Sequence, residues 1–209
     1  MSTSEILSLS PNSVWEYFNG FNQIPRPTGQ MEAICKYVMD FGKSLNLEVA
    51  QDKVGNVLIK KPASKGYEGA KTVIIQSHLD MVPQKNADVA HDFSKDPIQT
   101  YIDGDWVKAR STTLGADNGI GCAMMMAVLA DNTLKHPAIE AFFTVDEEVG
   151  MDGAFGLKSG FLSGTLMLNL DTEEDGDLCV GCAGGADANI VFQFKPDNEI
   201  DKGDVAFKI

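Results

Sequence analysis

Residues 72–80, with the sequence Thr-Val-Ile-Ile-Gln-Ser-His-Leu-Asp, place a histidine and an aspartate directly behind a short apolar run. Acidic residues likewise follow apolar runs in residues 139–148 (IEAFFTVDEE) and 165–171 (TLMLNLD). Residues 54–60 form a further β-branched run. Runs of this length predict strands, and the most apolar of them predict strands buried on both faces, as in a mainly parallel sheet covered by helices. These segments are therefore expected to build the central sheet.

Helical segments surround the predicted strands. Val14, Phe18 and Phe21, for example, have the spacing of a helix with one buried face. The segments of helical character are residues 11–24, 30–47, 119–131 and 153–159. Residues 99–110 instead predict an antiparallel hairpin that turns at Asp103-Gly104. The alternation of strands and helices predicts the α/β class, with a mainly parallel sheet flanked by helices.

The composition is that of a globular protein with a large acidic excess. The chain has 209 residues, of which 44% are hydrophobic, and a formal net charge of −13. Such a charge argues against nucleic acid and anionic membrane as partners. No apolar run approaches the ~18 residues of a membrane helix, and the N-terminus lacks the pattern of a secretory signal. We therefore expect a cytoplasmic protein whose cysteines (Cys35, Cys122, Cys179 and Cys182) are reduced thiols.

Charged side chains follow the predicted buried strands at the point where each strand ends. In open α/β sheets, ligands bind outside the carboxyl ends of the strands, so these side chains are expected to gather along one edge. Histidine and carboxylate are ligands that zinc accepts. Asp117 joins the set from the loop before the glycine-rich helix. The candidate residues are His78, Asp80, Asp117, Glu147, Glu148 and Asp171.

The spacing of these residues indicates which of them can bind a metal, orient a ligand or act as a base. His78 and Asp80 are two residues apart, so they share a face of an extended backbone, and the carboxylate can accept the second N–H of the imidazole. Glu147 and Glu148 are adjacent and point differently, so one can ligate while the other stays free as a base. Taken singly, each pair is more often an ordinary hydrogen-bonded pair or a solvated loop. Their joint placement at strand ends favours a metal site.

Other short motifs carry less chemistry. Residues 119–124 (GIGCAM) lack the third glycine of a dinucleotide loop and are interpreted as a helix start with close backbone packing. The Cys179 to Cys182 pair is interpreted as structural, because no second pair accompanies it. His91 and His136 are expected at the surface, and residues 173–177 are expected to form a solvated loop.

Long stretches of the chain then match a known family. The matching segments are residues 78–86 (HLDMVPQKN), 91–99 (HDFSKDPIQ), 101–110 (YIDGDWVKAR), 112–121 (TTLGADNGIG), 147–157 and 181–185 (GCAGG). They closely resemble the aminoacyl-histidine dipeptidases (Xaa-His dipeptidases), which belong to the co-catalytic zinc exopeptidases. The resemblance runs from about Ser10 to Gly185 and implies a metallodipeptidase that prefers Xaa-His substrates such as β-alanyl-histidine.

The resemblance also implies a role for each candidate residue. His78 and Asp171 would bind one zinc ion, Asp117 would bridge both ions, and Glu148 would bind the second. Asp80 would orient His78, and Glu147 would be the general base for a hydroxide shared by the two ions. Cobalt or manganese would also suit such a site.

The length of the chain leaves two functional hypotheses open. Members of the family are longer, and the resemblance implies that residues 1–187 are an incomplete catalytic domain. Residues 188–209 would then begin an inserted lid and dimerisation domain, with a homodimer expected for the full-length form. A histidine that the family's final segment supplies to the second zinc is absent. The chain is therefore either a working metallodipeptidase or a truncated fragment that binds metal without turnover; a scaffold with merely superficial carboxylates ranks below both.

Overall fold

The computed structural model describes residues 5–174, 176–181, 184–186 and 188–193. Contacts divide the chain into two units, Met1–Asp175 and Gly176–Ile209. All helices and strands of the described residues belong to the first unit. The domain boundary expected after residue 187 stays a prediction.

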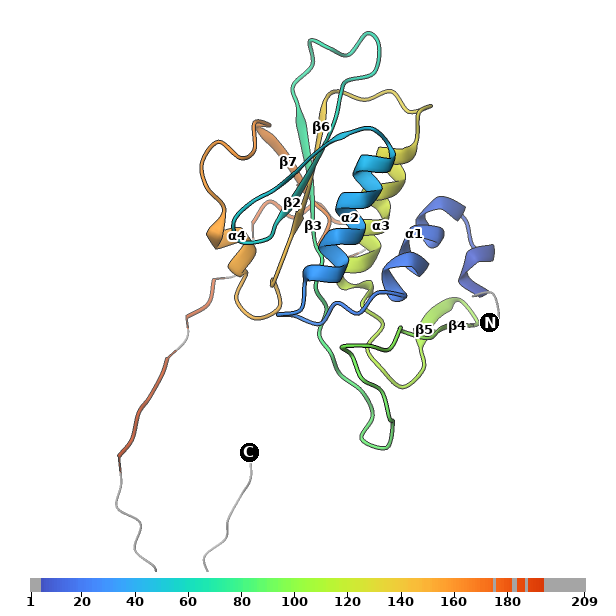
Figure 1. The fold of residues 1–209 in the computed structure, drawn as a ribbon, viewed down its shortest axis with the longest axis vertical. Coiled ribbons are helices and arrows are strands. Elements are labelled where there is room, and N and C mark those ends of the chain that lie inside the picture. Colours follow the sequence, from blue (N-terminus) through green and yellow to red (C-terminus); the bar gives the residue numbers. More distant parts are fainter. Residues whose placement is uncertain (1–4, 175, 182–183, 187, 194–209) are drawn as a thin grey trace, which may run out of the picture. The chain divides into compact units, whose positions relative to one another are not determined.

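A five-stranded sheet forms the centre of the first unit, with the strand order β1-β2-β6-β3-β7 (Figure 1). Its strands are β1 (Glu48–Gln51), β2 (Val57–Lys61), β3 (Val73–His78), β6 (Ile139–Thr144) and β7 (Leu166–Asn169). Strand β3 pairs in parallel with β6 on one side and with β7 on the other, whereas β1 and β2 join antiparallel. The predicted α/β class with a mainly parallel centre is confirmed.

Helices α2 (Glu32–Ser44) and α3 (Ala116–Ala130) cover one face of this sheet (Figure 1). The main core cluster joins Ile34 and Val38 of α2 and Met126 of α3 to Ile75 and Phe143 of the sheet. Each fully buried side chain of this kind contributes roughly 1.5–3 kcal/mol to folding. Helix α1 (Asn12–Asn22) packs on α3 and extends the layer.

The predicted segments correspond to observed elements, with shifts at their ends. Helix α4 (Asp152–Gly156) is shorter than predicted, and the hairpin strands β4 (Thr100–Asp103) and β5 (Trp106–Ala109) turn one residue later than expected. Strand β1 and the short 3-10 helix Glu5–Ser8 were not predicted. Strand β1 lies at the sheet edge and has no fully buried residue. Its sequence, EVAQ, therefore lacks the apolar run by which the other strands were predicted.

Strand β7 corrects the expectation of a strand buried on both faces. Leu166, Met167 and Leu168 keep 50%, 46% and 48% of their surface exposed. In the described part of the chain, β7 is the sheet edge and pairs only with β3. An apolar sequence shows what a strand can bury, but burial also requires a partner that covers it.

The surface expectation for His136 is wrong. Its ring is buried, and its Nδ1 lies 2.8 Å from the carbonyl oxygen of Pro137. Cys35, Cys122 and Cys179 are free thiols, as expected, while Cys182 lies outside the described residues.

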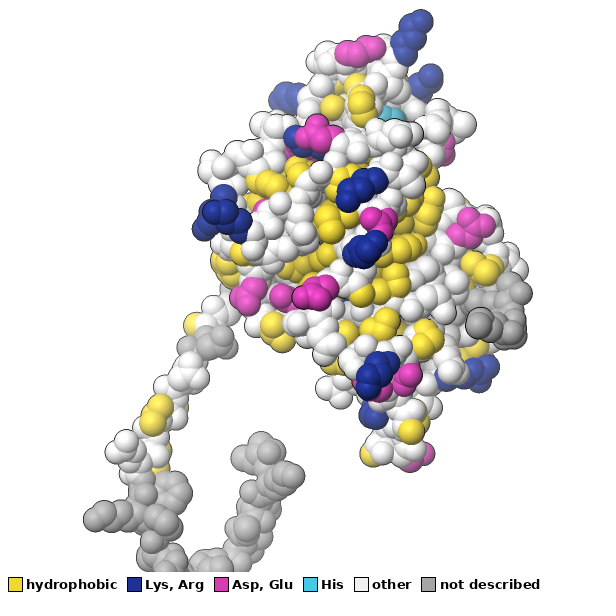
Figure 2. Space-filling view, in the orientation of Figure 1, with side chains coloured by type: hydrophobic (Ala, Val, Ile, Leu, Met, Phe, Trp, Pro, Cys, Tyr) yellow, Lys and Arg dark blue, Asp and Glu magenta, His cyan; other side chains and the backbone are white. Residues whose placement is uncertain are grey.

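The C-terminal expectations are tested only in part. Residues 188–193 show neither helix nor strand, and residues 194–209 of the expected lid and dimerisation domain lie outside the described residues. None of the helices in the described ranges is long and apolar enough to cross a membrane. On the face drawn in Figure 2, acidic and basic side chains are interspersed around a central area of hydrophobic ones.

Candidate metal centre

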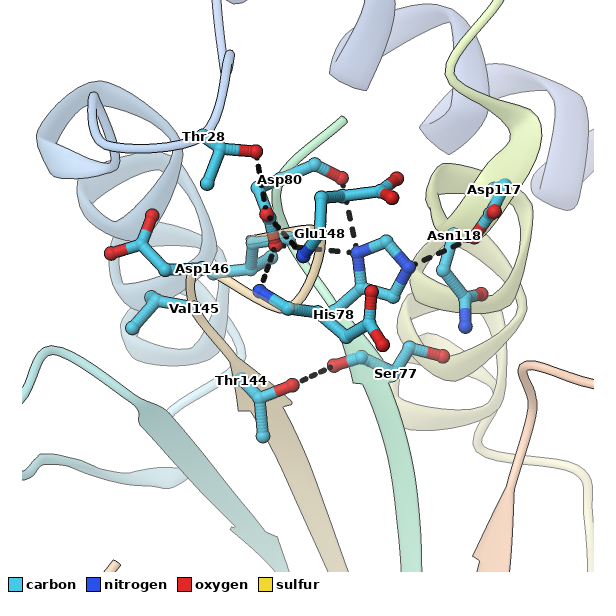
Figure 3. Close-up of polar contacts among 12 residues, drawn as sticks. Thr28, Ser77, His78, Asp80, Asp117, Asn118, Thr144, Val145, Asp146 and Glu148 are labelled. Carbon is cyan, nitrogen blue, oxygen red and sulfur yellow. Dashed lines mark hydrogen bonds and ion pairs between the residues drawn. The ribbon is translucent and has the colours of Figure 1, made fainter. Parts of the chain in front are cut away.

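His78 is the last residue of β3 and the centre of the candidate site. Its side chain is 1% exposed, with Nε2 lying 2.8 Å from Oδ1 of Asp117 and 3.5 Å from Oδ1 of Asp171. On the other side of the ring, Nδ1 lies 3.1 Å from the carbonyl oxygen of Asp80 and 3.3 Å from its Oδ1. Figure 3 shows the imidazole between Asp80 and Asp117. The ring is thus held by Asp80 at one nitrogen and presents the other nitrogen to two carboxylates.

The carboxylate of Asp80 is fully buried and holds the turn that follows β6. Oδ1 accepts the backbone N–H of Glu147 at 3.0 Å, and Oδ2 accepts that of Glu148 at 3.2 Å. Oδ2 also accepts the hydroxyl of Thr28 at 2.9 Å. Burial alone would raise the pKa of Asp80, but the hydrogen bonds lower it to about 2. Asp80 is therefore an ionised group that ties strand β3 to the glutamate pair.

The imidazole of His78 is surrounded by negative charge. Burial alone would lower the pKa of His78, but hydrogen bonds to Asp171, Asp80 and Asp117 outweigh this effect and raise it to about 11. Without a metal, the ring would hold a proton at neutral pH. Since metals bind the neutral imidazole, a metal ion would replace that proton.

Glu147 and Glu148 follow Asp146, whose φ of 52° lies in the left-handed region. Burial raises the pKa of Glu147, and neighbouring carboxylates add to this rise. Burial also raises the pKa of Glu148, and the charge of Asp117 adds to it. Both carboxyl groups are thus better proton acceptors than free glutamate.

Asp117 lies where α3 begins irregularly. Gly115 precedes the helix with φ 68°, and Asp117 has the non-helical angles φ −79° and ψ 110°. Asn118, a residue that the sequence analysis missed, donates from Nδ2 to Oδ1 of Asp171 at 2.6 Å. Its only signal in the sequence is its place beside Asp117. Asn118 connects the start of α3 to the end of β7.

The structure brings all the predicted site residues to one edge of the sheet. One oxygen or nitrogen atom each of His78, Asp117 and Glu148 lie within 4.8 Å of one another. Asp171 stands outside this trio but faces the same nitrogen of His78. A histidine with several carboxylates is a donor set that suits zinc, so the residues fit a metal site.

A cavity of about 210 Å³ adjoins the carboxylates. Glu147 and Asp171 form part of its wall, and Phe142 and Met167 are among its apolar lining residues. The start of α3 is closely packed, as predicted for residues 119–124. A Cβ at Gly121 would lie 2.5 Å from Oγ of Ser77, so the backbone leaves no room for a side chain there.

Comparison with known proteins agrees with this chemistry. Residues 74–198 match the model of peptidase family M20/M25/M40. The cytosol non-specific dipeptidase of Escherichia coli is 52% identical over 184 residues, which are 88% of this chain and 38% of that protein. This chain thus spans well under half of that relative's length.

Two solved structures show the same fold. The crystal structure of an aminoacylhistidine dipeptidase from Vibrio alginolyticus is 52% identical with a TM-score of 0.81, covering 83% of this chain and 35% of that one. A tripeptidase from Staphylococcus aureus has a TM-score of 0.66 at 21% identity, covering 80% of this chain and 45% of that one. At this lower identity the likeness concerns the fold alone.

Proposed function

The chain belongs to peptidase family M20/M25/M40, and on this premise we propose that it carries the metal centre of a zinc-dependent dipeptidase. The observation that supports this most is the position of His78, which is oriented by Asp80 and faces Asp117 and Asp171. The likeness to a dipeptidase of E. coli at 52% identity points to the same class of reaction.

We place the metal ligands as follows. His78 and Asp171 would hold one zinc ion, Glu148 would hold a second, and Asp117 would serve both. The distances from Nε2 of His78 to both aspartates, and the closeness of Glu148 to the same group, support this assignment. Bound zinc supplies Lewis acidity, which polarises the scissile carbonyl and makes water more acidic.

Glu147 is the proposed general base. It follows the turn that Asp80 holds, beside the ligands, and its raised pKa suits a group that accepts and returns a proton. Glu147 takes the proton of the attacking water and then delivers it to the leaving amine. Asp80 keeps His78 in the orientation that this step requires.

The proposed substrates are dipeptides, with Xaa-His preferred. The solved relative from V. alginolyticus is named for aminoacylhistidine, whereas the relative from E. coli is named as non-specific, so the preference is the first point to test. A cytoplasmic location is proposed as well, because the name of the E. coli relative places that protein in the cytosol.

A second candidate function is metal binding by these 209 residues without turnover. The observation that favours it is the single trio of donors that the described residues bring together. Zinc titration of the 209-residue chain distinguishes the two functions: two tight sites together with dipeptidase activity would exclude the second.

The decisive experiment compares matched glutamate variants of the whole zinc-loaded protein on β-alanyl-histidine and on dipeptides without histidine. Glu147→Gln should lower kcat by about 10²–10⁴-fold, the usual contribution of a general base, with zinc content unchanged. Glu16→Gln, on an exposed position of α1, is the control and should leave both unchanged. Full activity of the Glu147→Gln variant, or no dipeptide cleavage by the wild type, would overturn the proposal.

A further inference from the structure

Residues 25–29 (PRPTG), here called the strap, connect α1 to α2 and contact the segments that carry His78, Asp117 and Glu148. Arg26 donates to the carbonyl oxygens of Leu79 and Asp80 at 3.0 and 3.1 Å. Its other terminal nitrogen donates to the carbonyl oxygen of Gly115 at 2.5 Å. The sequence marks this segment only as a break between two helices, so these contacts come entirely from the tertiary structure.

We propose that Arg26 and Thr28 are positioning residues of the metal centre, holding the segments of His78, Asp117 and Glu148 at the spacing that metal binding needs. The proposal rests on the proposed function, since it concerns the same site. It assigns to the strap a role separate from ligation and from proton transfer.

Arg26 links the end of β3 to the start of α3. One terminal nitrogen, Nη1, donates to the carbonyl oxygens of Leu79 and Asp80, and the other, Nη2, donates to that of Gly115, two residues before Asp117. The planar fork of an arginine suits such a bridge, because its donors point in fixed directions. Arg26 therefore bridges the segments that carry His78 and Asp117.

The fold leaves room for this guanidinium at two glycines. A Cβ at Gly115 or at Gly119 would lie 2.5 Å from Nη2 of Arg26. Gly115 also has φ +68°, which disfavours any other residue. The start of α3 is thus shaped around Arg26.

General helix electrostatics does not account for a cation at this position. The N-terminal end of a helix carries partial positive charge, so a cation there is unfavourable. Arg26 is 1% exposed, and in the described part of the chain no carboxylate lies within ion-pair distance of it. Burial lowers its pKa to about 10, an effect partly offset by Asp80, Asp117 and Glu148, so it stays charged at neutral pH. Its guanidinium donates to three backbone carbonyls of the segments around the metal centre and lies 5.5 Å from the centre of the Phe21 ring.

Thr28 fixes the carboxylate that orients His78. Its hydroxyl donates to Oδ2 of Asp80, the oxygen that also accepts the N–H of Glu148 (Figure 3). The next residue, Gly29, donates its N–H to Asp146 at 2.7 Å. The strap therefore holds both the aspartate and the turn that carries the glutamate pair.

The first test removes one hydroxyl. Thr28→Val in the whole protein should weaken zinc binding about 10-fold, the lower end of the effect of groups that orient metal ligands. Thr28→Ser, which keeps the donor, should restore it. The absorption spectrum of the cobalt-loaded protein should change in Thr28→Val and return in Thr28→Ser, because it reports the geometry of the ligands.

Thr133→Val is the matched control. The hydroxyl of Thr133 also donates to an aspartate, Asp131, at 2.7 Å, but at the opposite end of α3. This variant should leave zinc affinity and the cobalt spectrum unchanged. Equal zinc affinities of Thr28→Val and Thr133→Val would overturn the role of Thr28.

The second test keeps the charge of Arg26 and removes its fork. Arg26→Lys should weaken zinc binding about 10-fold or more, because an ammonium lacks the two separate terminal nitrogens with which Arg26 binds Leu79 and Asp80 on one side and Gly115 on the other. Lys61 offers the control, since it is a buried cation that donates to the carbonyls of Val128 and Asp131 at 3.1 and 2.6 Å. Lys61→Met should lower the unfolding midpoint but not zinc affinity.

The outcomes separate this proposal from the proposed function. A wild-type protein that binds no zinc overturns both. A wild-type protein that binds zinc and cleaves dipeptides, with Thr28→Val and Arg26→Lys binding zinc equally well, overturns the positioning role alone. A loss of stability in Arg26→Lys with unchanged zinc affinity of the folded fraction would likewise show that Arg26 is only structural.

Discussion

Strands β6 and β7 flank β3 on opposite sides, run parallel to it and lead into carboxylates of the same site, yet their surroundings differ. All residues of β6 (Ile139–Thr144) are buried, whereas all residues of β7 (Leu166–Asn169) are exposed. Phe142 of β6 and Met167 of β7 line the same cavity from the two sides. The site thus has one wall packed into the core and one wall at an edge.

This difference shows which part of the site the described residues hold most firmly. The turn after β6 is held by Asp80 through the N–H groups of Glu147 and Glu148. Asp171, which follows β7, is held mainly by contacts of its carboxylate with the side chains of Asn118 and His78. An exposed, apolar edge strand is also an available surface for further pairing.

The largest expected effect is on stability, and it compares β6 with β7 directly. In the 209-residue chain, Phe143→Ala should lower the free energy of unfolding by about 3–5 kcal/mol, because it opens a cavity in the main core. Leu168→Ala, in the half-exposed strand, should cost under about 1 kcal/mol. Urea denaturation measures both, and equal losses would show that β7 is as well covered in solution as β6.

The next effect concerns acid. Because the folded pKa of Asp80 is about 2, below the unfolded value of 3.8, its contribution is fully present above pH 4 and is lost as pH falls towards 2. For the metal-free chain this loss should amount to about 2 kcal/mol. The raised pKa values of Glu147 and Glu148 act in the opposite direction, disfavouring the folded state as pH rises above their usual range.

Urea denaturation of the wild type and of Asp80→Asn between pH 5 and pH 2 checks this expectation. The variant should start less stable and lose less on acidification, since it has no carboxyl group to protonate at this position. If the stability of the wild type and of the variant changed with pH in the same way, Asp80 would not be the group that holds the turn after β6.

The smallest effect concerns the proton of His78, which lies between the walls. Since its pKa is about 11 in the metal-free site, zinc binding at neutral pH should release this proton. Zinc affinity should then rise about tenfold per pH unit, or about 1.4 kcal/mol, between pH 6 and pH 8. Calorimetry in buffers of different ionisation enthalpy counts the protons released.

Asp171→Asn sharpens this measurement, because the hydrogen bond to Asp171 is the first of the contacts that raise the pKa of His78. The variant should release less than the wild type near pH 8. Unchanged proton release would show that Asp171 does not raise the pKa of His78.

Much of the site was predictable because its residues follow local rules. The two-residue spacing of His78 and Asp80 places both on one side of an extended chain, and the structure holds them 3.3 Å apart. The parallel arrangement then brings the ends of β3, β6 and β7 to one edge.

The missed residues depend on contacts between segments far apart in the sequence. Arg26 lies next to Leu79 and Gly115, and Thr28 next to Asp80, although no pattern around the strap indicates this. His136 is buried in spite of a polar neighbourhood. Local periodicity indicates what a segment can bury but not which other segment will cover it.

The sequence by itself determined the class of fold, the apolar strands and the identity of the carboxylates and the imidazole at their ends, because these depend on residue type and on spacing along the backbone. Only the tertiary structure decided that β6 is enclosed while β7 is exposed, and that a buried arginine bridges β3 and α3. Burial and long-range hydrogen bonds are properties of pairs of surfaces, and a single segment does not contain them.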